Sequence, residues 1–439
     1  MNKIMFISLG CDKNTVDSEF MLGQLRDRGF FLTNDESEAD CVVINSCAFI
    51  KDAQEESINA ILEAAEYKKT GSLKRIVVAG CLAQRYASEI KEEIPEVDAI
   101  IGTTAIDKIC DAVEGKGDYV DNIDRLPLPE TKRVVTTGGY YAYLKIAEGC
   151  DKHCSYCIIP HLRGKFRSIP MERLVKEAEF LAEGGTKELI LVAQETTVYG
   201  TDIYGKKMLS ELLRRLCRIE GLSWIRVMYC YPEEIDDELI ETMAEEPKIC
   251  HYLDLPIQHA SDSILRRMGR RTDRAQLDMI IGKIRNRIPD VALRTSLISG
   301  FPGETEEDHA ALLDFVEKTG FERLGDFTYS KEAGTPAAKF KDQIPARVKN
   351  KRRKEVMVLQ QRISLEKGKS RIGKIMDVMI EGKLPEDNIW IGRSYMDAPG
   401  VDGYVFVRSL RDHMSGDIIK VKITGSKEYD LMGEDIDLN

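Results

Sequence analysis

The first part of the chain, up to Gly115, alternates two hydrophobic patterns. Continuous apolar runs of strand length are each followed by a segment in which apolar residues recur every three or four positions, as they do on one face of a helix. The predicted strands are Lys3–Leu9, Cys41–Ile44, Arg75–Ala79 and Ala99–Ile101. Regular strand–helix alternation predicts a doubly wound parallel sheet, and we place this sheet in a domain of residues 1–125.

The same alternation begins again after an interruption. Between Gly115 and Val134 the chain contains glycine, aspartate and two prolines without a regular apolar period, so we place a domain boundary there. Six strands are then predicted, at Tyr141–Ile146, Leu189–Ala193, Trp224–Tyr229, His251–Leu255, Ala292–Ile298 and Phe327–Tyr329. The helices predicted between them are Met171–Ala182, Leu209–Ile219, Asp236–Met243, Arg274–Arg287 and Glu304–Lys318. Six consecutive units indicate a complete or partial βα barrel over residues 136–368, with functional loops at the carboxyl ends of the strands.

The last part of the chain, residues 369–437, changes to a β pattern. A charged helix, Ala346–Lys367, precedes it, and its basic residues are predicted on a solvated face. Short apolar runs separated by Gly, Pro and Asp turns then follow, at Ile375–Ile380, Trp390–Gly392, Gly403–Val407 and Ile418–Ile423. This pattern predicts a small all-β barrel, typical of an appended substrate-recognition module. The fold class is therefore α/β, in several domains.

The composition is that of a soluble globular protein. The chain has 439 residues, of which 43% are hydrophobic and 31% are charged, and this length calls for two to four domains on size alone. No apolar run approaches the length of a membrane span, and the N-terminal segment lacks the layout of a signal peptide. We therefore expect a cytoplasmic protein with no membrane partner. Its 11 cysteines are then metal ligands or buried thiols rather than disulfides.

The formal net charge of −11 is concentrated in the two terminal segments. Residues 1–135 carry a net charge of −9 and residues 371–439 a net charge of −4, whereas residues 136–370 carry +2. A protein built mainly to hold nucleic acid needs Lys and Arg against the phosphates. The acidic terminal segments therefore favour a basic protein partner, although a local patch can override net charge.

Three cysteines stand together just after the first predicted strand of the second domain. Cys150, Cys154 and Cys157 have the spacing C-x₃-C-x₂-C on one short loop. Three thiolates can hold three irons of a four-iron cluster and leave the fourth iron open, as a catalytic metal keeps a position free for substrate. The alternative is a structural zinc knuckle with His153 or His161 as fourth ligand. Zinc sites usually use a second cysteine hook or a histidine pair, and no second hook lies nearby.

Three further cysteines follow predicted strands of the first domain. Cys11, Cys47 and Cys81 each lie one to three residues beyond a strand end. The carboxyl ends of parallel strands meet at one edge of the sheet, where ligands bind. Any one of these cysteines alone is more often a small buried hydrophobe. Three at equivalent positions indicate a second metal site with an open iron.

The C-x₃-C-x₂-C loop, with the aromatic Tyr156 before its last cysteine, resembles the radical S-adenosylmethionine (SAM) enzymes. The three strand-end cysteines before it and the small β domain after it narrow the resemblance to the methylthiotransferases, over essentially the whole chain. Segments that look like the branch modifying a small-subunit ribosomal protein are Leu9–Glu19, Val192–Thr197, Gly392–Pro399 and Tyr429–Leu431. The resemblance implies a central barrel of radical SAM type and a terminal barrel of TRAM type.

The resemblance also implies a reaction and its cofactors, two 4Fe-4S clusters and SAM. The cluster of the Cys150 loop would bind SAM and cleave it reductively to methionine and a 5′-deoxyadenosyl radical. The radical would abstract hydrogen from the β-carbon of an aspartate in the twelfth protein of the small ribosomal subunit, at the decoding centre. The cluster of Cys11, Cys47 and Cys81 would deliver a methylthio group, whose methyl comes from a second SAM molecule.

Contacts to SAM are implied at Tyr156, Gly184, Gly185, Ser296, Ile298 and Gly300. Gly184 and Gly185 match the glycine pair that the family places near the methionine amino group, but such a pair is also a common helix stop. Ser296, Ile298 and Gly300 lie at the end of a predicted strand and resemble the segment near ribose and adenine. The alternative is that the residues after Gly300 only form a turn into the following helix.

The expected partners follow from the same resemblance. They are a small-subunit ribosomal protein, free or in the assembled subunit, as substrate, and a low-potential electron donor such as flavodoxin or ferredoxin; the chain is expected to be a monomer. Two alternatives stay open. The sister branch of the family methylthiolates a transfer-RNA adenosine, against which the acidic terminal domain argues. A passive iron–sulfur carrier or zinc-stabilised binding protein would not cleave SAM.

Overall fold

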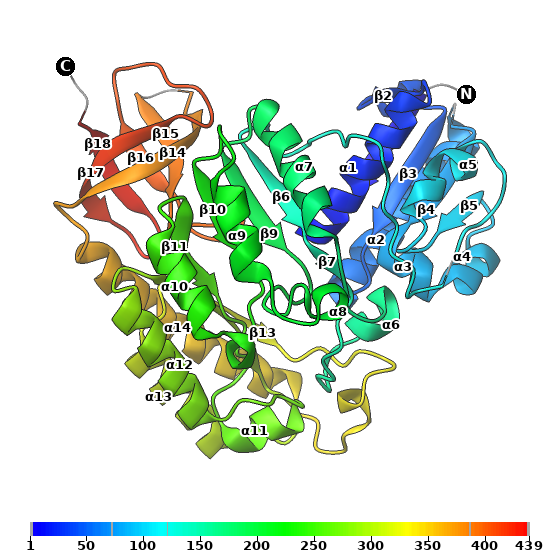
Figure 1. The fold of residues 1–439 in the computed structure, drawn as a ribbon. Helices are drawn as coiled ribbons and strands as arrows, with labels where there is room; N and C mark the ends of the chain where they lie inside the picture. The colour runs from blue at the N-terminus through cyan, green and yellow to red at the C-terminus, as the bar shows by residue number, and fades with distance from the viewer. Residues whose placement is uncertain (1–2, 72, 121, 386–387, 437–439) are drawn as a thin grey trace.

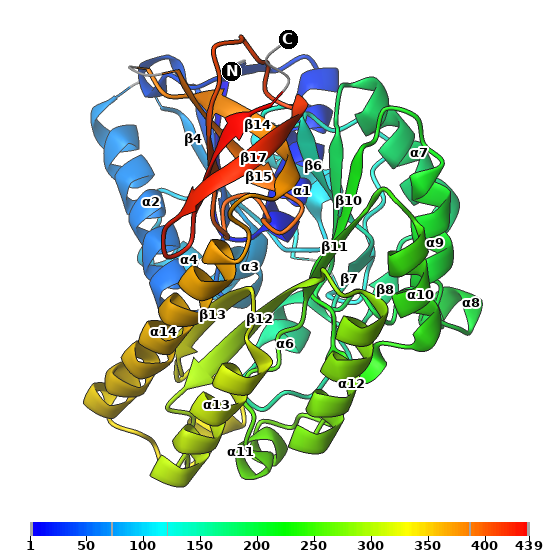
Figure 2. The same cartoon turned by 90° about the vertical axis from the view of Figure 1, so that its left-hand side faces the viewer.

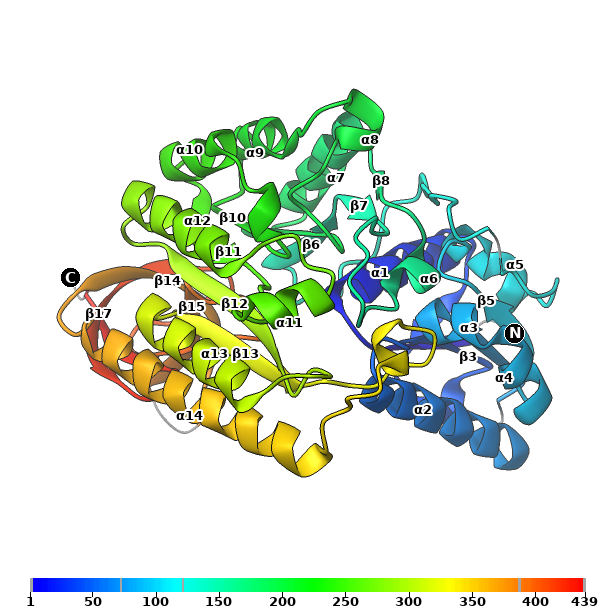
Figure 3. The same cartoon turned by 90° about the horizontal axis from the view of Figure 1, so that it is seen from below.

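The computed structural model describes residues 3–71, 73–120, 122–385 and 388–436 (Figure 1). The predicted domain limits at residues 1 and 437 lie outside the described residues. Three units follow one another along the chain: a parallel sheet with its helices, a second parallel sheet with an outer layer of helices, and a closed barrel of strands. The second unit lies between the other two (Figures 1 and 3).

The first unit is a doubly wound parallel sheet, as predicted. Its strands are β1 (Lys3–Ser8), β2 (Phe31–Thr33), β3 (Cys41–Ser46), β4 (Arg75–Ala79) and β5 (Ala99–Ile101), in the order β2-β1-β3-β4-β5. Its helices are α1 (Asp12–Asp27), α2 (Lys51–Thr70), α3 (Gly80–Arg85), α4 (Ala87–Glu93) and α5 (Ile109–Val113). Alternate strand residues point to opposite faces. Ile44 and Val78 accordingly belong to one apolar core, and Val43 and Val77 to another. The edge strand β2 was not predicted, because three residues with two exposed side chains show no period.

The second unit is an open sheet of six parallel strands, so the barrel is partial. The strands are β6 (Tyr141–Lys145), β9 (Glu188–Val192), β10 (Trp224–Val227), β11 (Ile249–Asp254), β12 (Ala292–Ser299) and β13 (Arg323–Thr328), and β6 and β13 form the two edges. The helices that follow the strands are α7 (Met171–Glu183), α9 (Leu209–Cys217), α10 (Asp237–Glu245), α12 (Arg274–Arg287) and α13 (Glu306–Thr319). Shorter elements are the β7–β8 pair (Ala147–Glu148 and Arg167–Ser168), α6 (Ile159–Arg163), α8 (Thr201–Tyr204) and α11 (Asp262–Arg267).

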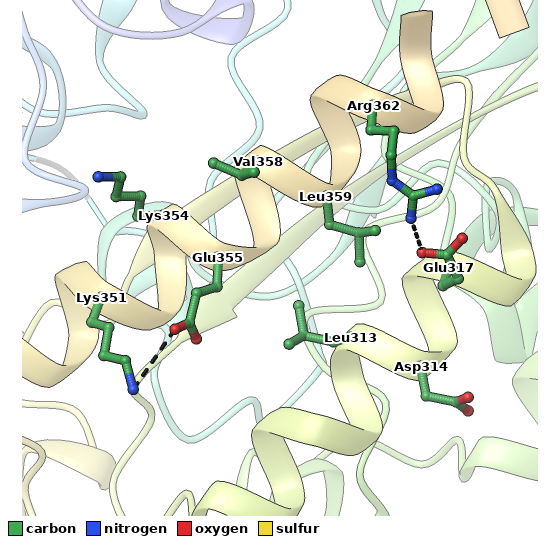
Figure 4. A pocket seen from close by; sticks show the side chains of 9 residues that line it. All are labelled: Leu313, Asp314, Glu317, Lys351, Lys354, Glu355, Val358, Leu359 and Arg362. Atoms are coloured by element: carbon green, nitrogen blue, oxygen red, sulfur yellow. Dashed lines mark hydrogen bonds and ion pairs between the residues drawn. The ribbon is translucent and has the colours of Figure 1, made fainter. Parts of the chain in front are cut away.

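The helix α14 (Ala346–Lys369) runs along β13 and α13 and leads into the terminal barrel (Figure 2). Between α13 and α14 lies a groove lined by Leu313 and Leu359 (Figure 4). The ion pair Arg362–Glu317 crosses it, and Lys351–Glu355 lies along α14. The groove belongs to the outer helical layer, and none of the predicted site residues lines it. Within the described ranges, no helix is both long and apolar enough to cross a bilayer.

The third unit is a closed barrel of five strands. They are β14 (Ile375–Lys383), β15 (Ile389–Ser394), β16 (Val405–Arg408), β17 (Ile418–Ser426) and β18 (Leu431–Asp435), in the order β14-β15-β16-β18-β17. Four of these strands overlap the predicted β runs. The fifth, β18, was missed because its sequence, LMGED, is short and ends in two acidic residues. It closes the barrel by pairing parallel to β16 and antiparallel to β17.

The barrel packs directly against the inner face of the second sheet. Ile190 and Val192 of β9 share one apolar core with Val378 and Val407 of the barrel. Glu188, at the start of β9, joins the two units, because Arg226 of β10 and Arg393 of β15 each donate to it at 2.7 Å. All three side chains are 0% exposed. The barrel is therefore fixed to the sheet by apolar burial and by buried ion pairs, and is not loosely tethered.

The first and second units also meet through the segment after β13. Figure 3 shows this segment (yellow) reaching α2 and α3. Glu332 accepts a hydrogen bond from the backbone N–H of Lys51 at 3.1 Å, and Arg85 of α3 donates to the carbonyl oxygen of Ala333 at 2.6 Å. The edge of the first sheet therefore faces the loop end of the second sheet.

Candidate functional site

The loop of Cys150, Cys154 and Cys157 leaves the second sheet through a sharp turn at Gly149. This residue has a φ of +82°, and a Cβ atom there would lie 2.0 Å from the carbonyl oxygen of Lys165, so only glycine fits. The N–H of Gly149 donates to Oε1 of Gln194 at 2.8 Å, and the N–H of Cys150 donates to the carbonyl oxygen of Gly164 at 3.1 Å. The start of the loop is therefore fixed on both sides.

The thiols of this loop are withdrawn from water and receive backbone donors. Burial raises the pKa of Cys150 and of Cys157 to about 12. The N–H of Lys152 points to Sγ of Cys150 at 3.4 Å, and that of Ile159 points to Sγ of Cys157 at 3.5 Å. A buried thiolate needs a compensating positive group. Thiol ligands with N–H donors on sulfur suit an iron–sulfur cluster.

The Cys150 loop offers three thiols, none of them in a disulfide, as ligands. Among the residues that the structure describes, no three Cys, His, Asp or Glu side chains converge as ligands of one metal ion. A four-iron cluster asks for a broader arrangement, because each thiolate binds a different iron. The three thiols of the Cys150 loop fit that arrangement in number and in chemistry, since soft sulfur ligands select iron–sulfur clusters or zinc over harder ions.

Glu195 places a buried carboxyl beside this loop. It lies three residues after the end of β9, and its Oε2 lies 3.8 Å from Nζ of Lys152. The same oxygen has no hydrogen-bond partner among the described residues, whereas Thr197 donates to Oε1. Burial raises the pKa of Glu195 to about 7, although Thr197 and Lys152 act in the opposite direction. A buried oxygen without a donor is a ready acceptor for a ligand's ammonium or hydroxyl group.

The second set of cysteines lies at the carboxyl edge of the first sheet. Cys11 directly precedes α1, Cys47 follows β3, and Cys81 lies in α3 after β4. Because β1, β3 and β4 are neighbours in the sheet, these positions share one edge. Their proximity is direct at Gly10, which has a φ of +92° and where a Cβ atom would lie 2.8 Å from Cβ of Cys47. The structure thus brings the three strand ends together, as the topology predicts.

The thiols of this second set are close enough to influence one another. Burial raises the pKa of Cys81 to about 12; Arg163 lowers it, and the thiols of Cys47 and Cys11 raise it. Cys47 and Cys81 are buried, whereas Cys11 is exposed. The edge therefore presents two sheltered sulfurs and one open to ligands. This all-thiol set is the donor chemistry that iron–sulfur clusters use.

A buried ionic network that sequence reasoning missed lies between the two cysteine sets. Arg163, in α6 after the Cys150 loop, pairs with Asp17 of α1 at 2.7 Å and with Glu148 at 3.1 Å. Lys145 pairs with the same two carboxylates. Burial would raise the pKa of Glu148, but Arg163 and Lys145 together hold it at about 2. No sequence signal could connect residues as distant as Asp17 and Arg163, since only the packing of the two units joins them.

Four of the predicted SAM contacts lie at the loop end of the second sheet. Tyr156 and Ile298 pack on the same small apolar cluster, in which the rings of Tyr156 and Phe301 are 6.5 Å apart. Ser296 and Ile298 exchange backbone hydrogen bonds with Gln258, at 2.9 and 2.8 Å. Gly300 follows β12 with a φ of +72°. Tyr156, Ser296, Ile298 and Gly300 therefore share one region with the Cys150 loop.

Gly184 and Gly185 lie apart from the other four predicted contacts. Gly184 is the C-cap of α7, and the N–H of Gly185 donates to the carbonyl oxygen of Ala182 at 3.0 Å. Glu188 then begins β9, so the pair sits at the amino end of that strand, across the sheet from the loop. The helix-stop alternative explains both glycines. Glu195 lies three residues beyond the carboxyl end of the same strand.

Three sequence families match consecutive parts of the chain. Residues 3–102 match Uncharacterized protein family UPF0004, residues 144–316 match the Radical SAM superfamily, and residues 372–436 match the TRAM domain. The chain is also similar along its whole length to proteins called Ribosomal protein uS12 methylthiotransferase RimO. The one from Lachnoclostridium phytofermentans is 64% identical, over 98% of this chain and 99% of the relative. Those from Desulforamulus reducens and Clostridioides difficile are each 49% identical, over 99% of both chains.

Solved structures share the fold at low sequence identity. The radical SAM methyltransferase TsrM of Kitasatospora setae, with cobalamin and a 4Fe-4S cluster bound, aligns with a TM-score of 0.55 at 14% identity, over 91% of this chain and 82% of the other. The cobalamin-dependent radical SAM enzyme OxsB aligns with a TM-score of 0.51 at 14% identity, over 77% and 55%. The sequence relatives decide the family: this chain belongs to the RimO family of radical SAM methylthiotransferases, transferases whose cofactors are SAM and 4Fe-4S clusters.

Proposed function

We propose that the protein transfers a methylthio group to ribosomal protein uS12, at the β-carbon of an aspartate. The observation that supports this best is the pair of cysteine sets at the junction of the first two units. One set lies on the loop after β7, and the other lies at the carboxyl edge of the first sheet. Arg163, in the helix α6 that follows this loop, donates to Sγ of Cys81 in the second set. Two neighbouring cluster sites suit a reaction that needs both a radical and a sulfur donor. The whole-length relatives carry the uS12 assignment in their names.

In this proposal Cys150, Cys154 and Cys157 hold one 4Fe-4S cluster, and Cys11, Cys47 and Cys81 hold the second. When bound, the clusters and SAM supply the 5′-deoxyadenosyl radical and the methylthio group. The chain binds and orients these groups and keeps solvent from the radical. Four of the six cysteines are buried, Cys157 is partly buried and Cys11 is exposed, which supports that sheltering role.

The SAM contacts that we propose lie along the carboxyl ends of the strands. Tyr156 and Ile298 pack on the apolar cluster, where a ribose and a purine would lie. Ser296 lies in β12, and Gly300 follows that strand. Glu195 adds an acceptor, because its Oε2 lacks a donor among the described residues and lies beside the Cys150 loop. We infer that this carboxylate receives the amino group of SAM, a charge-assisted hydrogen bond.

The domain roles follow from the same arrangement. We assign residues 1–125 to sulfur delivery, 136–368 to radical formation and 369–437 to recognition of uS12, in the free protein or in the ribosomal subunit. We further propose that the protein acts as a monomer in the cytoplasm and is reduced by flavodoxin or ferredoxin. The buried contacts of the terminal barrel with β9 and β10 hold the recognition module in a fixed place relative to the cysteine loop.

The test is a comparison of two substrates with one enzyme preparation. The full-length protein, reconstituted anaerobically with iron and sulfide, is incubated with SAM, a reductant and either purified uS12 or unmodified tRNA. We expect one methylthio group on an aspartate of uS12, located by tandem mass spectrometry, and none on tRNA. Methylthiolation of a tRNA adenosine without modification of uS12 would contradict the proposal and favour the sister branch. The whole chain is needed because the barrel shares its apolar core with the second sheet.

A further inference from the structure

Arg163 reaches from the second unit into the cysteine edge of the first. Its side chain is 2% exposed, and its Nε donates to Sγ of Cys81 at 3.4 Å. Its Nη2 donates to the side-chain oxygen of Asn14 in α1, the helix that begins immediately after Cys11. One guanidinium therefore contacts a proposed cluster ligand and also fixes the helix next to another.

The other side of the same guanidinium pairs with two buried carboxylates, which also pair with a lysine. Nη1 lies 2.7 Å from Oδ2 of Asp17 and 3.1 Å from Oε2 of Glu148, and Lys145 pairs with both of these carboxylates. Two positive and two negative side chains thus hold one another in place, and the guanidinium is the member of this network that contacts Cys81. The negative charge of a cluster at Cys81 would meet a cation whose position is already fixed by other bonds.

Burial makes this contact electrostatically important. A charge within a few ångströms acts more strongly in a dry interior than at a surface, because water does not screen it. An N–H donor on a ligand sulfur stabilises the thiolate, and hydrogen bonds to sulfur are among the factors that set the reduction potential of a cluster. The reduced cluster carries one more negative charge than the oxidised one, so a nearby cation favours reduction.

We propose that Arg163 is a positioning residue of the second cluster site, holding Cys81 and the start of α1 in place and raising the reduction potential of the cluster bound there. The proposal rests on the proposed function, since it takes Cys11, Cys47 and Cys81 as cluster ligands. It makes the site composite: three thiolates come from the first unit and one guanidinium from the second. Assembly of the sulfur site then depends on docking of the radical SAM unit.

The test isolates the second cluster in the full-length protein. A Cys150→Ala/Cys154→Ala/Cys157→Ala background removes the first cluster, and Arg163→Gln and Arg163→Lys are introduced into it. Arg133→Gln is the matched control. The Arg133 side chain is 0% exposed and pairs at 3.0 Å with Glu19, which lies on α1 as Asp17 does. None of its hydrogen bonds and ion pairs with the described residues involves a cysteine. The readouts are iron per chain, retention of iron against a chelator, and the midpoint potential from an EPR-monitored redox titration.

Arg163→Gln is expected to weaken retention of the cluster roughly 10-fold, the size typical for the loss of an outer-shell partner, and to move its midpoint potential to a more negative value. Arg163→Lys keeps the positive charge but loses the planar set of guanidinium N–H donors. Its cluster retention and midpoint potential are expected to lie between those of Arg163→Gln and the parent. Arg133→Gln is expected to match the parent in both readouts.

Several results would overturn the proposal. Unchanged retention and potential in Arg163→Gln would do so, and so would equal changes in Arg133→Gln. If Arg163→Gln does not fold, judged by circular dichroism, a parent-like midpoint and retention in Arg163→Lys contradict the role of the guanidinium. If the Cys150→Ala/Cys154→Ala/Cys157→Ala protein with Arg163 intact binds no cluster at all, the proposed function is refuted instead. Failure of the proposed function can therefore be told apart from failure of the role of Arg163.

Discussion

Replacing Cys150, Cys154 and Cys157 with alanine is expected to reduce reductive cleavage of SAM to background. These three thiols are the ligands that the loop after β6 offers, and the backbone N–H groups of Lys152 and Ile159 already point at two of their sulfurs. Without the thiols, nothing on this loop binds iron, and without the cluster SAM has no electron donor beside it. The measurement is anaerobic formation of 5′-deoxyadenosine with dithionite as reductant.

The control for this prediction is Cys217→Ala. Cys217 is a buried thiol at the end of α9, part of the core between sheet and helices, and we assign it no role. Its replacement is expected to leave SAM cleavage near the wild-type rate, with at most a modest loss of stability from the lost packing. SAM cleavage that survives in the triple variant would show that the loop does not hold the reactive cluster.

Glu188→Gln is expected to lower the free energy of unfolding by about 3–5 kcal/mol, the usual cost of leaving a buried ion pair without one partner. Glu188 accepts from Arg226 and Arg393 at 2.7 Å each, and all three side chains are 0% exposed. The neutral amide cannot compensate two buried guanidinium groups. The effect is read from thermal and urea denaturation of the full-length protein.

The matched control is the exposed pair of Lys3 and Glu38, whose side chains are 46% and 50% exposed. Glu38→Gln is expected to change stability by less than about 1 kcal/mol, because water screens a surface pair. If Glu188→Gln were as mild as Glu38→Gln, the buried network would not be what fixes the terminal barrel to the sheet.

The same network predicts a loss of stability in acid. Burial acts to raise the pKa of Glu188, but Arg393 and Arg226 outweigh it and the net pKa is lowered. Because folding lowers its pKa, ionised Glu188 contributes its full stabilisation of the folded protein above the ordinary pKa of a carboxyl group. This stabilisation is lost as the pH falls through the lowered pKa. The stability difference between the wild-type protein and Glu188→Gln should therefore be full at pH 7 and shrink below about pH 4.5.

Periodicity and topology were sufficient to predict the framework of the fold. The buried runs around Cys41 and Arg75 form strands where predicted, because central parallel strands are continuously apolar. The convergence of Cys11, Cys47 and Cys81 on one edge could be inferred without coordinates, since each follows a parallel strand. The C-x₃-C-x₂-C spacing alone was enough to predict that the loop of Cys150 binds a cluster.

Features that depend on packing between units were not predictable from the sequence. Arg163 stands in an ordinary short helix, and its contact with Cys81 exists only because the first unit docks on the second. Gly184 and Gly185 match a motif by composition, but the direction of α7 carries them to the far end of the strands. Glu188 precedes the predicted strand Leu189–Ala193, and its two arginine partners come from β10 and β15.

The central claim is that two cluster sites with different tasks lie on either side of Arg163. Iron content and SAM cleavage, measured together on wild type and on Cys11→Ala/Cys47→Ala/Cys81→Ala after anaerobic reconstitution, test it most directly. We predict that iron falls from two clusters per chain to one, that SAM cleavage is retained, and that methylthiolation of uS12 is lost. Unchanged iron content in the triple variant would contradict the second site and with it the division of labour between the two sets of cysteines.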